Sequence, residues 1–204
     1  MKMKNKGLLI VVSGPSGTGK GTVCKALIEK NNNIFLSVSA TTRPPRKGEV
    51  EGVNYYFKSK EEFKTMIQNN EFMEWAVFCK NYYGTPRKAV EDMLNQGKDV
   101  ILEIEVQGAM KIRSEYPEGV YIFMLPPSLE ELRNRIMNRG TETEEVIHER
   151  LNTAKLEMEY MKKYNYIVVN DDIDKTVEKL EAIIIAEKCR IERNYEFIKE
   201  VCDI

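Results

Sequence analysis

Short apolar runs alternate along the chain with segments of helical periodicity. The runs are rich in Val, Ile and Leu and are bounded by Gly, Pro or charged residues, which indicates strands. Continuous apolar strands separated by helices are typical of a parallel sheet that is buried on both faces. We therefore predict an α/β fold with strands over 8–13, 34–39, 99–105, 119–125 and 166–170.

Capping and proline signals in the sequence also predict several helix boundaries. Ser128, with Glu131 three residues later, has the pattern of a capping box, and Gly140 is placed to end the helix that opens there. Pro86 suits the first turn of another helix. The segment 174–198 has helical periodicity, so we expect it to pack on the outside of the sheet.

Two segments interrupt the alternation. The first is rich in aromatic residues and predicts short antiparallel strands with one helix, a small mixed α/β insert. The second is charged and reads as a mobile helical lid. We predict a single domain over 1–204, with a core (1–39, 86–134 and 164–204), an insert (40–85) and a lid (135–163).

Composition excludes several classes of partner. Lys and Arg (31) nearly balance Asp and Glu (32), so no overall field attracts nucleic acid or a membrane surface. The apolar run Leu8–Val12 is too short for a signal peptide, and no run approaches the roughly 18 residues of a membrane span. The four cysteines show no metal-type spacing and are expected to be reduced thiols in a cytoplasmic protein: Cys24, Cys79, Cys189 and Cys202.

The stretch GPSGTGKGT follows the first predicted strand and opens a helix. In this context, glycines let backbone N–H groups converge on phosphate oxygens, the helix N-terminus adds attraction, and the lysine reaches the β- and γ-phosphates. The spacing predicts a nucleoside triphosphate site formed by Gly14, Pro15, Ser16, Gly17, Thr18, Gly19, Lys20, Gly21 and Thr22.

Gly21 departs from the usual loop, which has Ser or Thr directly after the lysine. That hydroxyl normally contacts magnesium. Mg²⁺ keeps much of its water shell and binds largely through substrate phosphates. The glycine therefore leaves undetermined only which protein group contacts the metal directly. Thr22 is one candidate, directly or through water.

A second anion site is indicated downstream. Arg43 and Arg46 flank a rigid Pro-Pro pair, and two guanidiniums bind a phosphate through charge-assisted, bidentate bonds. Tyr55 and Tyr83 offer hydroxyls to the same anion. A solvated loop is the alternative for the two arginines.

With these segments the sequence resembles the guanylate kinase family. SGPSGTGKGT, SVSATTRPPRKGE, NEFMEWA, NYYGT, NRGTETEE and VNDD match family segments in order, over roughly residues 7–190. The resemblance implies a P-loop kinase core and transfer of the γ-phosphate of ATP to GMP with Mg²⁺, in purine nucleotide metabolism. It also implies a GMP pocket lined by Ser39, Arg43, Arg46, Tyr55, Glu74, Tyr83, Thr85 and Glu103.

The resemblance assigns further roles by position. Ser39, Glu74 and Thr85 would read the base, Glu103 would lie near the base and Glu105 near the magnesium. Asn170 and Asp171 would lie near the adenine or ribose of ATP. The lid would bring catalytic arginines to the transferring phosphate beside Lys20 and Arg43, namely Arg135, Arg139 and Arg150.

The assignment of Glu74 has an independent physical reason. Guanine presents N1–H and its N2 amino group side by side, two donors that match the two oxygens of one carboxylate. Adenine has a lone pair at N1, so the same carboxylate would lose a bond and meet repulsion. Such a polar pocket discriminates by roughly four orders of magnitude.

Other interpretations stay open. Glu103 and Glu105 are alternatively structural, and Arg135 alternatively pairs with Glu131 on its own helix. The chain is alternatively a kinase for another nucleoside monophosphate, a scaffold-type binding module, or a plain ATPase. The intact loop glycines and Lys20 disfavour the scaffold, and the second anion site disfavours the ATPase. The use of dGMP and the choice between monomer and homo-oligomer are not determined by the sequence.

Overall fold

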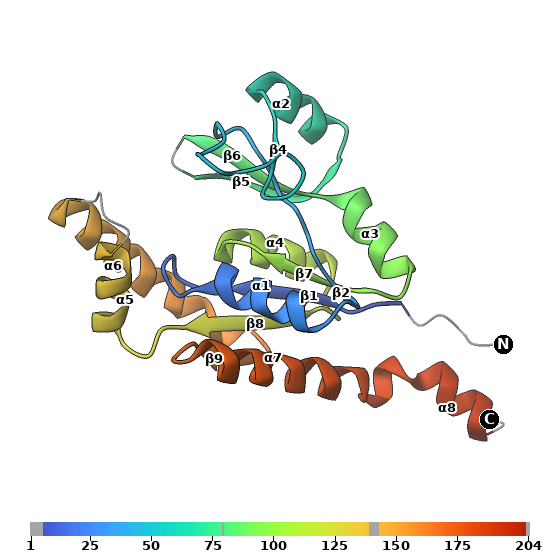
Figure 1. The fold of residues 1–204 in the computed structure, drawn as a ribbon. Coiled ribbons are helices and arrows are strands. Elements are labelled where there is room, and N and C mark those ends of the chain that lie inside the picture. The colour runs from blue at the N-terminus through green and yellow to red at the C-terminus, as the bar shows by residue number, and fades with distance from the viewer. Residues whose placement is uncertain (1–5, 79, 139–142, 203–204) are drawn as a thin grey trace.

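The protein is described here by a computed structural model that covers residues 6–78, 80–138 and 143–202. Its main sheet is parallel throughout, with β1 at the centre (Figure 1). The predicted α/β fold with a parallel sheet is confirmed. In spatial order the strands are β2 (Ile34–Leu36), β7 (Asp99–Glu103), β1 (Leu9–Ser13), β8 (Val120–Leu125) and β9 (Tyr166–Val169).

Helices cover both faces of this sheet, so β1 is apolar at every position except its final Ser13. Ile10 and Val12 belong to one core cluster with residues of α1 and α7, whereas Leu9 and Val11 belong to another with residues of α3 and α4. Alternate side chains of a strand point to opposite faces, which explains the division. The helices are α1 (Lys20–Lys30), α3 (Arg87–Asn95), α4 (Val106–Glu115) and α7 (Ile173–Lys188).

A second, smaller sheet stands apart from the first (Figure 1). Its β3–β4 pair is parallel and its β3–β6 and β5–β6 pairs are antiparallel, so the insert is mixed rather than purely antiparallel. Phe63 of α2 stacks on Phe72 with ring centroids 4.4 Å apart, which gives the insert its own small core. Its elements are β3 (Ala40–Thr41), β4 (Tyr56–Phe57), α2 (Lys60–Gln68), β5 (Phe72–Phe78) and β6 (Asn81–Pro86).

The predicted lid comprises the end of α5 (Leu129–Met137), all of α6 (Glu144–Met158) and the 3-10 helix η1 (Glu159–Lys163). The side chain of Ser128 caps α5 by accepting from the N–H of Glu131, as the capping pattern predicts. Gly140 and Arg139, which were expected to end this helix and to serve catalysis, lie outside the described residues. The helix α5 also crosses the predicted boundary between core and lid at 134/135, so the division into core, insert and lid stays a proposal.

Several predicted boundaries were wrong. The second strand ends at Leu36 rather than Ser39, because the chain then leaves the sheet towards the insert. The strand β7 ends at Glu103, and Glu105 is already the N-cap of α4. Pro86 is the last residue of β6, not the first of a helix, since its ψ of 119° is extended.

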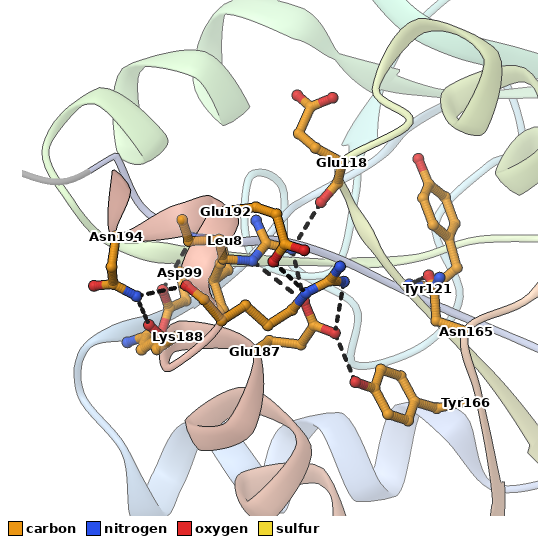
Figure 2. A network of polar contacts seen from close by, with 12 residues as sticks. Leu8, Asp99, Glu118, Tyr121, Asn165, Tyr166, Glu187, Lys188, Glu192 and Asn194 are labelled. Carbon is orange, nitrogen blue, oxygen red and sulfur yellow. Dashed lines mark hydrogen bonds and ion pairs between the residues drawn. The ribbon is translucent and has the colours of Figure 1, made fainter. Parts of the chain in front are cut away.

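The C-terminal segment is not one continuous helix either. After α7 the chain turns through the short 3-10 helix η2 (Ile191–Arg193) into α8 (Tyr195–Cys202). The break coincides with a network of ion pairs at the amino ends of the strands (Figure 2). Buried Glu187 accepts hydrogen bonds from Tyr166 at 2.6 Å and from Arg193 at 2.8 Å.

Asp99 is the second buried carboxylate of this network. It accepts from the N–H of Leu8 at 3.0 Å and pairs with Lys188 at 2.6 Å (Figure 2). The amino ends of the strands are thus occupied by structural ion pairs, and the carboxyl ends carry the loops where α/β sheets bind ligands. No helix of the described chain is both long and apolar enough to cross a membrane.

Candidate active site

The glycine-rich loop lies between the carboxyl end of β1 and the start of α1, as predicted. Gly14, Gly17 and Gly19 have φ values of 145°, 97° and 88°. L-residues rarely adopt these conformations, so the loop path depends on glycine. A Cβ at Gly19 would also lie only 2.5 Å from Nδ2 of Asn170, which packs against the loop.

The side chain of Lys20 is folded back along the loop. It is only 8% exposed, and its Nζ donates to the carbonyl oxygens of Gly14 at 2.5 Å and Pro15 at 3.2 Å. These bonds hold a buried ammonium in place within a loop whose backbone is shaped to receive an anion.

Asn170 braces the loop from the end of β9. Its Nδ2 donates to the carbonyl oxygen of Thr18 at 2.7 Å, and its Oδ1 accepts from Thr176 at 3.2 Å. Asp171 is exposed and lies 3.6 Å from the ammonium of Lys179. The structure therefore turns the Asn170 amide inward to the loop, while the predicted contact of Asn170 and Asp171 with ATP stays a prediction.

Two lid arginines reach the same loop. Arg135 pairs with Glu131 at 2.7 Å, which was the alternative expectation, but its Nη1 and Nη2 also donate to the carbonyl oxygens of Thr18 and Asn170. Arg150 of α6 donates through Nη2 to Oγ of Ser16 at 2.7 Å. Arg135 and Arg150 thus fasten α5 and α6 to the glycine-rich loop.

A cavity of about 370 Å³ joins this loop to the insert. Its walls combine residues from the phosphate loop with residues that the sequence assigns to the acceptor pocket. This juxtaposition links segments far apart in the chain. Its lining residues include Lys20, Thr22, Ser39, Tyr55, Glu74, Tyr83, Glu103 and Glu105.

Glu74 is the most deeply buried acid of the cavity, at 7% exposure. Thr85 does not line the cavity, but its hydroxyl donates to Oε1 of Glu74 at 2.8 Å and so orients the carboxyl group. Burial raises the pKa of Glu74, and the hydrogen bond from Thr85 opposes that rise. The second oxygen, Oε2, lies beside Gly108, where a Cβ would approach it to 2.6 Å.

Only two of the four predicted phosphate-binding side chains, those of Tyr55 and Tyr83, line the cavity. Arg43 is ion-paired with Glu49 at 2.7 Å and lies 5.4 Å from the centroid of the Tyr55 ring. Tyr55 and Tyr83 line the cavity with ring centroids 6.1 Å apart. Arg46 is exposed, and its backbone N–H donates to Glu49. Glu49 therefore occupies the guanidinium of Arg43 that the sequence assigns to the acceptor phosphate.

Glu103 and Glu105 both line the cavity but have different neighbours. Both oxygens of Glu103 come close to the position that a Cβ on Gly21 would occupy, at 3.3 and 3.4 Å. Glu105 is exposed and lies near Glu157 of α6, and the two carboxyl groups interact. Burial and then the charge of Glu105 raise the pKa of Glu157 to about 7.

Three residues of the site were missed by sequence reasoning. Glu157 could not have been found, because only the packing of α6 brings its carboxyl group close to that of Glu105. Glu49 lies in the predicted phosphate-binding segment and its charge was overlooked. Gly108 carried a usable signal, since an isolated glycine within a helical pattern often marks a close approach.

The carboxylates fit a magnesium site only in combination with a nucleotide. Within the described part of the chain, no three His, Cys, Asp or Glu residues are grouped so that they alone could hold a metal ion. Mg²⁺ prefers oxygen ligands and is commonly held by one or two carboxylates together with substrate phosphates and water. Glu103, Glu105 and the exposed Thr22 offer such oxygens on the cavity wall.

A parallel α/β core, a phosphate loop with its lysine, and a second polar compartment facing that loop define a P-loop kinase. Comparison with known proteins specifies the family. A family model described as guanylate kinase matches residues 6–187. The guanylate kinase of Caldanaerobacter subterraneus subsp. tengcongensis is 59% identical over 201 residues, which cover 98% of each chain. That of Halalkalibacterium halodurans is 58% identical with the same coverage.

A solved structure agrees with the sequence relatives. The crystal structure of guanylate kinase from Anaplasma phagocytophilum matches with a TM-score of 0.81 and 37% identity, over 98% of this chain and 97% of that one. The chain belongs to the guanylate kinase family.

Proposed function

We propose that this chain transfers the γ-phosphoryl group of ATP to GMP, with the triphosphate on the phosphate loop and GMP against the insert. The observation that carries the proposal is the single cavity shared by Lys20 and Glu74. An ATPase needs only the first of these, whereas a phosphotransferase needs both substrates within reach of one another.

The chemistry requires no covalent intermediate with the protein. A phosphate oxygen of GMP attacks the γ-phosphorus in line, the bond from that phosphorus to the β-phosphate oxygen breaks, and ADP leaves. Lys20 and the lid arginines Arg135 and Arg150 stabilise the charge that spreads over the transferring group. A lid that lies against the phosphate loop also excludes water, which would otherwise compete with GMP as acceptor.

Base selection rests on Glu74. Its carboxylate matches the two adjacent donors of guanine, Thr85 holds one oxygen in place, and Ser39 lies on the same cavity wall. Tyr55 and Tyr83 offer hydroxyls to the GMP phosphate, and the guanidinium of Arg43 becomes available to it when the phosphate displaces Glu49. Arg46 is exposed and bonds Glu49 only through its backbone N–H, so its guanidinium is the second candidate for the phosphate.

Mg²⁺ is proposed as the required cation. When bound, it neutralises phosphate charge and orients the β- and γ-phosphates. Thr22, Glu103 and Glu105 are the groups of this chain that would hold it, directly or through its water. We also propose a cytoplasmic location. Cys24, Cys189 and Cys202 form no disulfide in the described chain, and we expect them to be reduced thiols, as in cytoplasmic proteins.

A four-substrate assay tests the proposal. The purified chain is given ATP and Mg²⁺ with GMP, AMP, CMP or UMP, and ADP formation is followed. We expect turnover with GMP that exceeds the other three by orders of magnitude. Faster turnover with AMP would indicate a different monophosphate kinase, and equal ADP formation without any acceptor would indicate an ATPase. Including dGMP in the assay shows whether the ribose 2′-hydroxyl matters.

A further inference from the structure

The glycine at position 21 is not required by the backbone. Gly21 lies in the first turn of α1 and is not among the residues with positive φ. Glycine is a poor helix former, so a residue with a side chain would favour this helix. Something other than backbone conformation must therefore account for the missing side chain.

The neighbour that a side chain would meet is Glu103. A Cβ at Gly21 would lie 3.3 Å from Oε2 and 3.4 Å from Oε1, closer than side chains usually approach. The hydroxyl of Ser or Thr would reach one bond further into the same space. Both carboxylate oxygens thus occupy the region next to the lysine where the usual phosphate loop presents its hydroxyl.

The main-chain position of Glu103 is well fixed. It ends β7 and is paired in register with Val12 of β1, directly before the phosphate loop. The side chain must extend from this strand end to reach α1, and a glutamate spans the gap. An aspartate at the same position would be one methylene shorter and would leave the space beside Gly21 open.

The charge of Glu103 acts on groups of both α1 and the insert. It contributes, after burial, to the raised pKa of Cys24, which lies one turn further along α1. For Tyr55 on the acceptor side, burial is likewise the largest cause of the raised pKa and the charge of Glu103 is the second. A carboxylate at the N-terminus of α1 is favourably placed in the field of the helix.

We infer that Gly21 and Glu103 are a matched pair, in which the absent side chain makes room for a carboxylate that replaces the usual loop hydroxyl at the metal–phosphate position. Glu103 is then a positioning residue for the magnesium-bound triphosphate rather than a reader of the guanine base. The inference rests on the proposed function for the identity of the triphosphate. The pairing would explain how a loop without this hydroxyl still holds Mg²⁺ together with the triphosphate.

The test is a double-mutant cycle with Gly21→Ser, Glu103→Asp and the double variant. Binding of a non-hydrolysable ATP analogue is measured by calorimetry with and without Mg²⁺, and the melting temperature is recorded for each variant. Each single variant is expected to lose about tenfold or more of the Mg²⁺-dependent affinity, the typical effect of disturbing the groups around a metal. The double variant is expected to recover most of it, because the shorter acid leaves room for the hydroxyl.

Two further variants separate the steric effect of a side chain at position 21 from the effect of the negative charge at position 103. Gly21→Ala adds only the Cβ and is expected to fall between the wild type and Gly21→Ser. Glu103→Gln keeps the length of the side chain and is expected to retain the melting temperature while losing Mg²⁺-dependent affinity. This pair decides the question even where Gly21→Ser does not fold.

Three results would overturn the inference. The first is strict additivity of the two substitutions in the cycle, and the second is unchanged Mg²⁺ dependence of analogue binding in Glu103→Gln. The third is a loss of GMP binding alone in Glu103→Asp, which would show that Glu103 reads the guanine base. The readout is analogue binding, so it can be obtained whether or not GMP is the acceptor. Failure of the inference is therefore distinguishable from failure of the proposed function.

Discussion

Arg150 of the lid helix α6 donates a hydrogen bond to the hydroxyl of Ser16 in the phosphate loop, at 2.7 Å. The two residues are 134 positions apart in the chain, and only the packing of the lid brings them together. A guanidinium at this position lies against the predicted phosphate loop and remains charged at every working pH.

For Arg150, we expect substitution by Ala to lower kcat by about 10²–10³-fold, the usual effect of removing one donor to a transition-state charge. ATP affinity should change far less, since the contribution grows as charge develops. Steady-state kinetics check this, with Arg133→Ala as the control because Arg133 pairs with Glu144 on the exposed face of the lid. A rise in the KM for ATP with kcat unchanged would contradict the assignment.

For Lys20, we expect substitution by Met to leave the fold intact and to lower turnover on the order of 10³-fold or more. The methionine retains most of the apolar length of the side chain but cannot neutralise the phosphates. Circular dichroism and the coupled assay together check the expectation. Unchanged activity in a folded variant would refute the role.

For Glu74, we expect substitution by Ala to raise the KM for GMP about 10–100-fold with little change for ATP, because hydrogen bonds to a charged group are lost on the acceptor side only. The matched control is Glu71→Ala, an exposed acid just before the same strand β5. Equal effects on the two substrates would argue against base reading.

Glu74 also predicts how GMP binding depends on pH. Its pKa is raised by burial, so the folded protein retains the proton above the ordinary value of 4.5. The protonated form favours the folded state, and that stabilisation is lost as the pH rises through the raised pKa. GMP binding needs the carboxylate, so it should strengthen over the same interval.

Titration of GMP affinity against pH checks this, with Glu74→Gln measured in parallel. The phosphate of GMP titrates identically in both experiments, so the difference between the two curves isolates Glu74. We expect the variant to bind GMP weakly across the range, without the additional strengthening. Parallel curves would show that Glu74 does not titrate in this interval.

The ion-pair network at the opposite end of the sheet predicts an effect on stability without an effect on chemistry. Burial alone would raise the pKa of Glu187, but hydrogen bonds from Tyr166 and Arg193 outweigh it and lower the pKa. This contribution to stability is present above the pKa of the unfolded chain and is lost as the pH falls through the lowered value.

We expect Arg193→Met to lower the free energy of unfolding by about 1–3 kcal/mol, because it leaves a buried carboxylate with fewer donors. Arg190→Met is the control, since the side chain of Arg190 is half exposed and lies 3.5 Å from the same acid, where solvent screens the attraction. Denaturant unfolding measures both, and kcat should be unchanged. Equal losses would show that burial does not distinguish the two arginines.

Much of this protein could be predicted from the order of its residues. The apolar runs around β1, β7 and β8 indicated a buried parallel sheet, because strands covered on both faces are apolar at nearly every position. The edge strand β9 is also apolar, although Ile167 is 52% exposed. The glycines and Lys20 specified the phosphate loop, since the chemistry is carried by adjacent backbone groups. Local signals of this kind survive in the sequence because the residues that act together are close in the chain.

The tertiary structure decided what depends on distant contacts. The break after α7 coincides with the ion pair between Arg193 and Glu187 and with the hydrogen bond from Arg193 to the carbonyl oxygen of Glu118, contacts that no local pattern reveals. The pairing of Arg43 with Glu49, the approach of Glu157 to Glu105, and the inward turn of Asn170 depend on side-chain packing. The sequence by itself determined which groups bear the chemistry, and the packing of helices and insert around the sheet decided which of them meet.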